Sequence, residues 1–84
     1  MSELALDAVL LHLVKGIVDE PDNVQVDSRS TARGTTLEVR VDPNDLGRVI
    51  GRNGKTAQAL RTVIGALARD ERVRIDVVDT DGER

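Results

Sequence analysis

The sequence contains no cysteine and no tryptophan, tyrosine or phenylalanine. Without cysteine, the chain cannot form a disulfide bond, a cysteine-ligated zinc site or a cysteine nucleophile. Without aromatic rings, it has no platform of the kind on which RRM, cold-shock and most OB-type modules stack bases. Long hydrophobic runs are missing too, because the most apolar stretch, residues 4–18, contains Asp7, His12 and Lys15. A membrane span is therefore excluded.

The size and composition of the chain are typical of one small domain. Its length of 84 residues leaves no room for a second core. Its composition, 39% hydrophobic and 32% charged, fits a globular chain. We expect the domain to occupy residues 1–79 and a polar tail to occupy residues 80–84. Residues 1–3 lack the positive charge of a signal peptide, so we expect a cytoplasmic protein.

Charge is distributed unevenly, although the formal net charge is only −3. Residues 1–28 carry one basic and six acidic side chains, residues 29–74 carry ten and five, and residues 75–84 carry one and four. Between residues 46 and 61 there are four basic side chains and no acidic one. Such a cluster favours an anion site, whereas the overall acidity argues against strong non-specific binding to nucleic acid.

Hydrophobic periodicity predicts three helices and three strands. The predicted helices span residues 4–20, 43–50 and 55–69, and the predicted strands span residues 24–28, 36–41 and 73–77. Ser2 could cap the first helix, which Pro21 ends, and Asp42 is the predicted N-cap of the second. A short turn at residues 31–34 makes the first two strands an antiparallel hairpin.

This order of elements, α-β-β-α-α-β, predicts an α+β fold with two layers. The two-helix crossover between the last two strands allows them to pair in parallel, so we expect a three-stranded mixed sheet with three helices on one face. Leu37, Val39 and Val41 would face the core. The apolar arc of the first helix is wider than one core contact needs, which leaves open whether the sheet covers it all or a partner covers part.

The loop at residues 51–54, Gly-Arg-Asn-Gly, is the most informative stretch. Two glycines let the backbone bend sharply between helices and let a sugar-phosphate chain approach it closely. The N-terminus of the following helix offers free N–H groups and a positive dipole end to a phosphate. Arg52 and Lys55 add positive charge, and Asn53 can donate or accept hydrogen bonds. The motif alone is weak evidence, but its place after Val49-Ile50 within this order of elements strengthens it.

Residues 46–56, Leu-Gly-Arg-Val-Ile-Gly-Arg-Asn-Gly-Lys-Thr, resemble the signature of a KH domain, and the order of elements resembles the type II, bacterial form. A free-standing domain of this size is similar to the KhpA family of small RNA-binding proteins. The resemblance implies binding of single-stranded RNA, a role as an RNA chaperone or post-transcriptional regulator, and pairing with a KhpB-like protein. It also implies a link to cell elongation and peptidoglycan homeostasis. It implies no cofactor.

The resemblance also assigns residues to a binding site. The loop Gly51, Arg52, Asn53 and Gly54 would clamp the backbone of about four nucleotides. Ile50, with Leu46 or Val49 and with Ala57 or Leu60, would form the floor of a groove for the bases. Arg48, Lys55, Gln58 and Arg61 could line its rim. Ala57 is smaller than the aliphatic residue that KH domains often have there, so we expect weak binding with little sequence preference.

Other functions find less support in the sequence. Gly54-Lys55-Thr56 resembles the end of an NTPase phosphate loop, but that motif needs a glycine where Val49 stands. His12 is the only histidine and fits a solvated surface. No nucleophile with a base can be assembled and no acidic cluster has metal-ligand spacing, so we predict neither an enzyme nor a metal site.

A protein-interaction module is the main alternative, in which the KH fold serves to dimerise and contact with RNA is incidental. One KH unit covers few nucleotides, and a second unit would raise affinity through avidity. Whether RNA binding or protein interaction is the main function, we therefore expect a homodimer or a heterodimer with a KhpB-like protein.

Overall fold

The computed structural model of the chain describes residues 5–68 and 72–80. The main elements, in chain order, are α1 (Leu6–Lys15), β1 (Gln25–Thr31), β2 (Gly34–Val41), α2 (Leu46–Ile50), α3 (Lys55–Ala68) and β3 (Val73–Asp79). The predicted order of helices and strands is confirmed. The predicted helix start at residue 4 is wrong, because Ala5 is extended and acts as the N-cap, so α1 begins at Leu6. The residue predicted as the cap, Ser2, the predicted end of α3 at residue 69 and residues 81–84 of the predicted tail lie outside the described residues. Within the described residues, no helix is long and apolar enough to cross a membrane.

The three strands form one mixed sheet in the order β1-β2-β3. β1 and β2 are antiparallel, with Val26 opposite Val39, and β2 and β3 are parallel, with Leu37 opposite Ile75. The predicted mixed sheet is therefore confirmed. Each strand is longer than predicted, because the hydrogen-bonded ladder needs only backbone groups and continues through polar residues at the strand ends.

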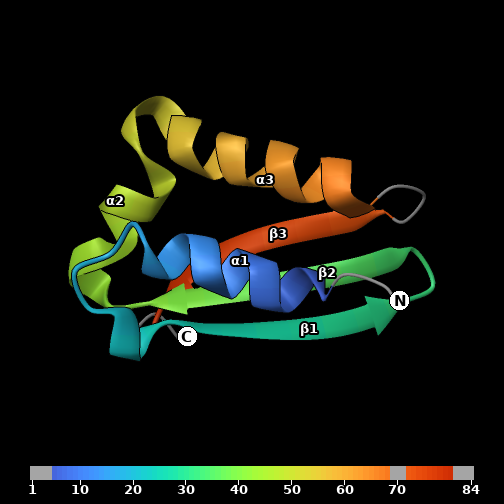
Figure 1. Cartoon of the computed structure of the whole chain (residues 1–84), viewed down its shortest axis with the longest axis horizontal. Coiled ribbons are helices and arrows are strands. Elements are labelled where there is room, and N and C mark those ends of the chain that lie inside the picture. Colours follow the sequence, from blue (N-terminus) through green and yellow to red (C-terminus); the bar gives the residue numbers. More distant parts are fainter. Residues whose placement is uncertain (1–4, 69–71, 81–84) are drawn as a thin grey trace.

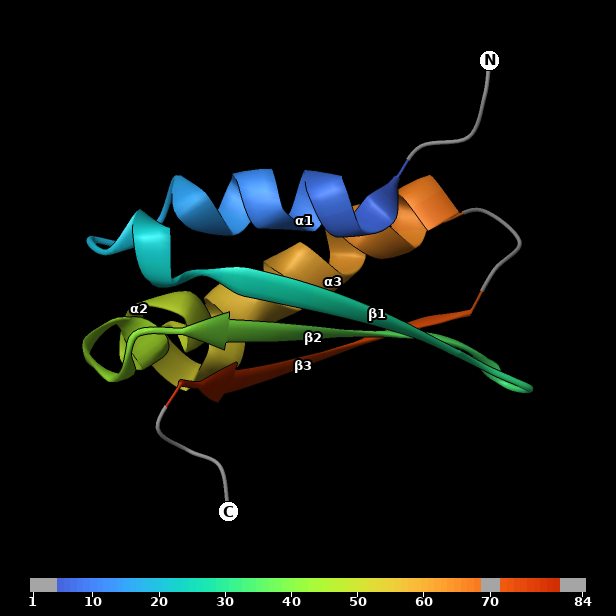
Figure 2. The same cartoon turned by 90° about the horizontal axis from the view of Figure 1, so that it is seen from below.

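Helices α1 and α3 lie over one face of the sheet. The short helix α2 lies beside them, next to the C-terminal end of β2 (Figures 1 and 2). The core lies between these two layers. Its buried side chains come from every helix and strand except β1, and include Leu10, Val14, Leu37, Val39, Val41, Val49, Leu60, Ile64 and Ile75. The prediction that Leu37, Val39 and Val41 face inward is confirmed.

Helix α1 ends at Lys15, five residues before the predicted end. Gly16 follows as the C-cap, and its N–H donates to the carbonyls of His12 and Leu13. Farther along, the N–H groups of Asp19 and Glu20 donate to the carboxylate of Asp45 instead of continuing a helix. The apolar stripe beyond Lys15 is still used, because Ile17 and Val18 pack against the core.

The apolar arc of α1 is largely used inside the domain. Leu10 and Val14 are fully buried, and the flanking side chains Leu6, Val9, Leu11 and Leu13 are half-buried against the core. Of the two possibilities left open by the sequence, cover by the domain itself therefore accounts for most of this arc.

Candidate nucleic-acid interface

The start of the second helical segment is set by Asp42 and Pro43. The Oδ1 atom of Asp42 accepts a hydrogen bond from the N–H of Asn44 at 2.9 Å, as an N-cap does. Pro43 occupies the first position, where no N–H is needed. The predicted cap is confirmed, but the predicted helix over residues 43–50 is divided. Residues 43–45 form a 3-10 turn, and α2 begins at Leu46.

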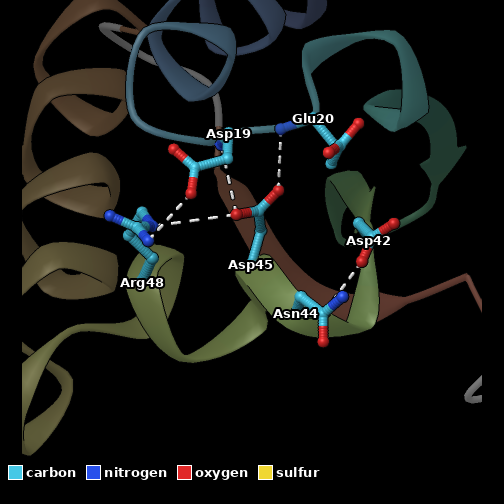
Figure 3. Close-up of polar contacts among 6 residues, drawn as sticks. All are labelled: Asp19, Glu20, Asp42, Asn44, Asp45 and Arg48. Atoms are coloured by element: carbon cyan, nitrogen blue, oxygen red, sulfur yellow. Dashed lines mark hydrogen bonds and ion pairs between the residues drawn. The ribbon is translucent and has the colours of Figure 1, made fainter.

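Asp45 joins this segment to the chain that leaves α1. Its side chain is almost completely buried, with 1% of the residue surface exposed. One carboxylate oxygen accepts the N–H of Asp19 at 3.1 Å, and the other accepts the N–H of Glu20 at 3.0 Å (Figure 3). These bonds satisfy a buried carboxylate and two backbone donors together, and they hold α2 against the 19–20 segment.

Arg48 projects from the next turn and contacts the same cluster. Its Nη2 lies 3.1 Å from Asp19 Oδ2, and its Nε lies 3.7 Å from Asp45 Oδ1 (Figure 3). Arg48 is a predicted rim residue, and two carboxylates already compensate its charge. Any phosphate that binds Arg48 has to compete with Asp19.

Gly51 ends α2 with a backbone conformation that only glycine adopts readily. Its φ is 81° and its ψ is 169°, and its N–H closes the helix on the carbonyl of Gly47 at 2.8 Å. A Cβ at this position would lie 2.3 Å from Thr56 Oγ1 and 2.7 Å from the Thr56 nitrogen. Space and torsion angles both require glycine here, so the main chain of Gly51 lies directly against Thr56 in the first turn of α3.

The other half of the loop is open. Asn53 adopts the left-handed conformation with φ 58° and ψ 25°, which asparagine tolerates better than most residues. Gly54 has φ 75°, and no atom lies within 4 Å of the position that a Cβ would occupy. The main chain at Gly54 is therefore bare and accessible, and a ligand backbone can approach it without meeting a side chain.

The loop offers hydrogen-bond donors and positive charge on this open side. The Gly54 N–H donates to the carbonyl of Gly51 at 3.0 Å, and the Lys55 N–H donates to the carbonyl of Arg52. Arg52 and Lys55 are exposed and form no ion pair with a described residue. Exposed cations beside a bare main chain at the N-terminus of a helix form a site for an anion.

The remaining predicted residues fall into exposed and buried groups. Ile50 precedes the loop and is 37% exposed, and Gln58 is exposed on α3. Arg61 is exposed as well, but its Nη2 donates to the carbonyl of Ile75 at 3.4 Å, so it bridges α3 and β3. Ala57 is buried, as are two of its suggested companions, Val49 and Leu60, while Leu46 is half-buried.

The structure thus brings the loop, Ile50, Lys55 and Gln58 to one end of α3. The cluster of Asp19, Asp45 and Arg48 that holds this end in place was not predicted from the sequence. The backbone partners of Asp45 stand 25 and 26 positions earlier in the chain. No local pattern signals such a contact.

Comparison with known families decides the identity of the fold. Residues 7–78 match the family described as KhpA/KhpB, KH domain. The chain belongs to the KhpA/KhpB family. With this membership and the α-β-β-α-α-β order on a mixed sheet, the chain is a type II KH domain, as its sequence predicted.

Individual KhpA relatives are similar over almost their whole length. The RNA-binding protein KhpA of Streptomyces coelicolor is 63% identical over 79 residues, which cover 94% of this chain and 99% of that protein. That of Leifsonia xyli is 64% identical over 74 residues, covering 88% and 97%. That of Halalkalibacterium halodurans is 41% identical over 70 residues, covering 81% and 92%. No solved structure gives a significant match.

Proposed function

We propose that the protein binds single-stranded RNA through the loop Gly51–Gly54. The observation that carries this proposal is the bare main chain at Gly54 beside the exposed cations Arg52 and Lys55, which form no ion pair with a described residue. RNA presents its phosphates to such a surface as a regular chain of anions. The relatives that carry the name RNA-binding protein support this choice of ligand.

Each part of the site has a distinct task in this proposal. The backbone N–H groups of Arg52 and Asn53 donate to phosphate oxygens, while Arg52 and Lys55 neutralise the charge. Ile50 offers its exposed aliphatic surface to the base next to the clamp. Gln58 lies one turn into α3, where an amide can donate to or accept from a base edge.

The remaining predicted residues make smaller contributions. Arg48 and Arg61 are already engaged, with Asp19 and with the carbonyl of Ile75, so each exchanges one partner for another on binding RNA. Ala57 is buried and adds little surface for a base. Binding should accordingly be weak and tolerant of sequence, because it depends mainly on the phosphate backbone.

The test of this proposal is a double variant, Arg52→Asp with Asn53→Asp, in a gel-shift titration with single-stranded RNA. Two carboxylates facing phosphate should lower affinity by about 100-fold or more, because reversing a charge about 4 Å from a phosphate costs several kcal/mol near a protein surface. The fold should persist, since Arg52 is exposed and aspartate also tolerates the left-handed conformation of residue 53.

A matched control separates the clamp from net charge. Gln25→Glu with Arg29→Asp changes the net charge by the same amount on exposed positions of β1, away from the loop. This control should keep most of the affinity. If the two double variants lose equal affinity for RNA, the change in net charge causes the loss and the clamp does not. If the folded loop variant binds RNA as well as the wild type, the clamp is refuted.

Family membership extends the proposal to a cellular role. We infer that the protein is an RNA chaperone or post-transcriptional regulator that acts as a dimer with itself or with a KhpB-like protein. The roles in cell elongation and peptidoglycan homeostasis follow from the same resemblance. The small footprint of one KH unit and the joint description of KhpA and KhpB domains in one family support a paired form.

A protein-interaction module remains the second candidate, and one observation favours a surface for it. Val63 on α3 is 45% exposed, the largest value among the exposed large hydrophobic side chains of the described residues. If dimerisation is the main function, the Arg52→Asp, Asn53→Asp variant should keep both its partner and its role in cells. If RNA binding is the main function, that variant should lose the cellular role even though it still dimerises.

A further inference from the structure

A second cationic site lies at the end of the molecule opposite to the RNA-binding loop. Figure 1 shows the turn between β1 and β2 beside the start of β3, and the α2–α3 loop at the other end of α3. An open hollow of about 290 Å³ lies here. Its lining includes three arginines, Arg33, Arg72 and Arg74, and three threonines, Thr31, Thr35 and Thr36.

Backbone contacts hold the turn that carries Arg33 against Arg72. The N–H of Thr35 donates to the carbonyl of Arg72 at 2.9 Å, and the N–H of Arg33 donates to Thr31 Oγ1 at 3.1 Å. Gly34 has φ 134°, and a Cβ there would lie 2.2 Å from the Arg72 carbonyl oxygen. Glycine therefore allows the turn to press against β3, which places Arg33 next to Arg72.

Within the described part of the chain, all charged residues that line the hollow are basic. Arg74 is compensated, since its Nε lies 3.3 Å from Asp76 Oδ1. Arg33 and Arg72 are exposed and form no ion pair with any residue in the ranges 5–68 and 72–80. A guanidinium group offers a fork of N–H donors to the oxygens of a phosphate group, which accept several hydrogen bonds at once.

We propose that this hollow holds a phosphate group of the same RNA strand that the Gly51–Gly54 loop clamps. The inference rests on the proposed function and extends it. Helix α3 has 14 residues and spans about 21 Å between the two sites. A strand of only four nucleotides would occupy the clamp alone, whereas a longer strand would reach Arg33 and Arg72. The domain would then hold more RNA than one KH clamp covers.

The test compares oligonucleotide lengths in the intact chain. Affinities are measured for uridine oligomers from about 4 to about 16 nucleotides, the range of lengths that single-stranded modules cover. The variant is Arg33→Ala with Arg72→Ala, which keeps the Cβ and carbonyl of residue 72 that touch the turn. The control, Lys15→Ala with Arg40→Ala, removes two positive charges outside the hollow.

In the wild type, affinity should rise again once the oligomer exceeds the length of the clamp. The Arg33, Arg72 variant should lose about tenfold in affinity for long oligomers, as expected for two exposed charge-assisted contacts, and nothing for the shortest. The slope of log affinity against log salt should fall by about 0.7 for long oligomers, because one phosphate contact on a single strand contributes about 0.7. The control should change neither the length dependence nor this slope.

The outcomes separate this inference from the proposed function. If the wild type binds no oligomer of any length, the clamp fails and the second contact fails with it. If short and long oligomers bind equally well and the Arg33, Arg72 variant matches the control, only the second contact is refuted. An NMR titration with inorganic pyrophosphate covers the remaining case. Shifts at Gly34 and Arg72 without any length dependence for RNA would make this a site for free anions and overturn the assignment to RNA.

Discussion

The buried carboxylate of Asp45 is the point where the RNA-binding end of the fold is most easily weakened. Its two oxygens accept from the N–H groups of Asp19 and Glu20, so α2 and the segment after α1 share one polar anchor. Asp45→Asn keeps the shape of this side chain. It replaces one accepting oxygen with an NH₂ group, which then faces a backbone donor.

The cost of this substitution follows from the geometry. One of two hydrogen bonds to a charged group is lost, worth about 1.5–3 kcal/mol, and a buried donor is left without an acceptor. The nearby Arg48 adds little, because its Nε lies 3.7 Å away and its side chain is half exposed. We expect Asp45→Asn to lower the free energy of unfolding by about 2–4 kcal/mol.

Urea denaturation followed by circular dichroism measures this change, and Asp42→Asn is the matched control. Asp42 also accepts a backbone N–H, but at a helix start where asparagine caps as well as aspartate, and its other oxygen accepts the side-chain amide of Asn23 in an exposed contact. The control should cost less than about 0.5 kcal/mol. Equal effects of the two substitutions, or an Asp45→Asn variant as stable as the wild type, would refute the anchoring role of Asp45.

Three further predictions concern the loop and its surroundings. Gly51→Ala should destabilise the fold by about 2–4 kcal/mol in urea titrations, because of its torsion angles and the contact with Thr56, whereas Gly47→Ala, inside α2 with open space around it, should be neutral or stabilising. Asp19→Asn should free Arg48 and raise RNA affinity about two- to threefold with a steeper salt dependence, as the loss of one exposed ion pair allows; an unchanged slope would show that Arg48 does not meet the RNA. Val63→Asp should shift sedimentation toward the monomer if α3 is the dimer surface, and an unaltered dimer would place that surface elsewhere.

Local patterns were sufficient to predict the fold and the loop. The alternation of Leu37, Val39 and Val41 predicts a strand with one buried face, and all three side chains are buried. The sequence Asp42-Pro43 predicts a helix start, and the cap is present. The glycines of the loop were likewise recognisable, because positive φ values at residues 51 and 54 are a property of the local chain.

Features that depend on distant residues could not be predicted in the same way. The apolar stripe of α1 continues to Val18, but the helix stops at Lys15 while Asp45 binds the N–H groups of residues 19 and 20. Arg33 and Arg72 are unremarkable in sequence, and only the close approach of Gly34 to β3 places them at one hollow. The engagement of Arg48 by Asp19 was hidden for the same reason.

The claim that the glycine loop grips RNA is tested most directly by following backbone amide NMR signals during titration with a single-stranded oligoribonucleotide. The account predicts that the largest shifts occur at residues 50–55, and that the Arg52→Asp, Asn53→Asp variant shows none there at the same RNA concentration. Shifts that leave residues 46–61 unmoved at saturating RNA would contradict it.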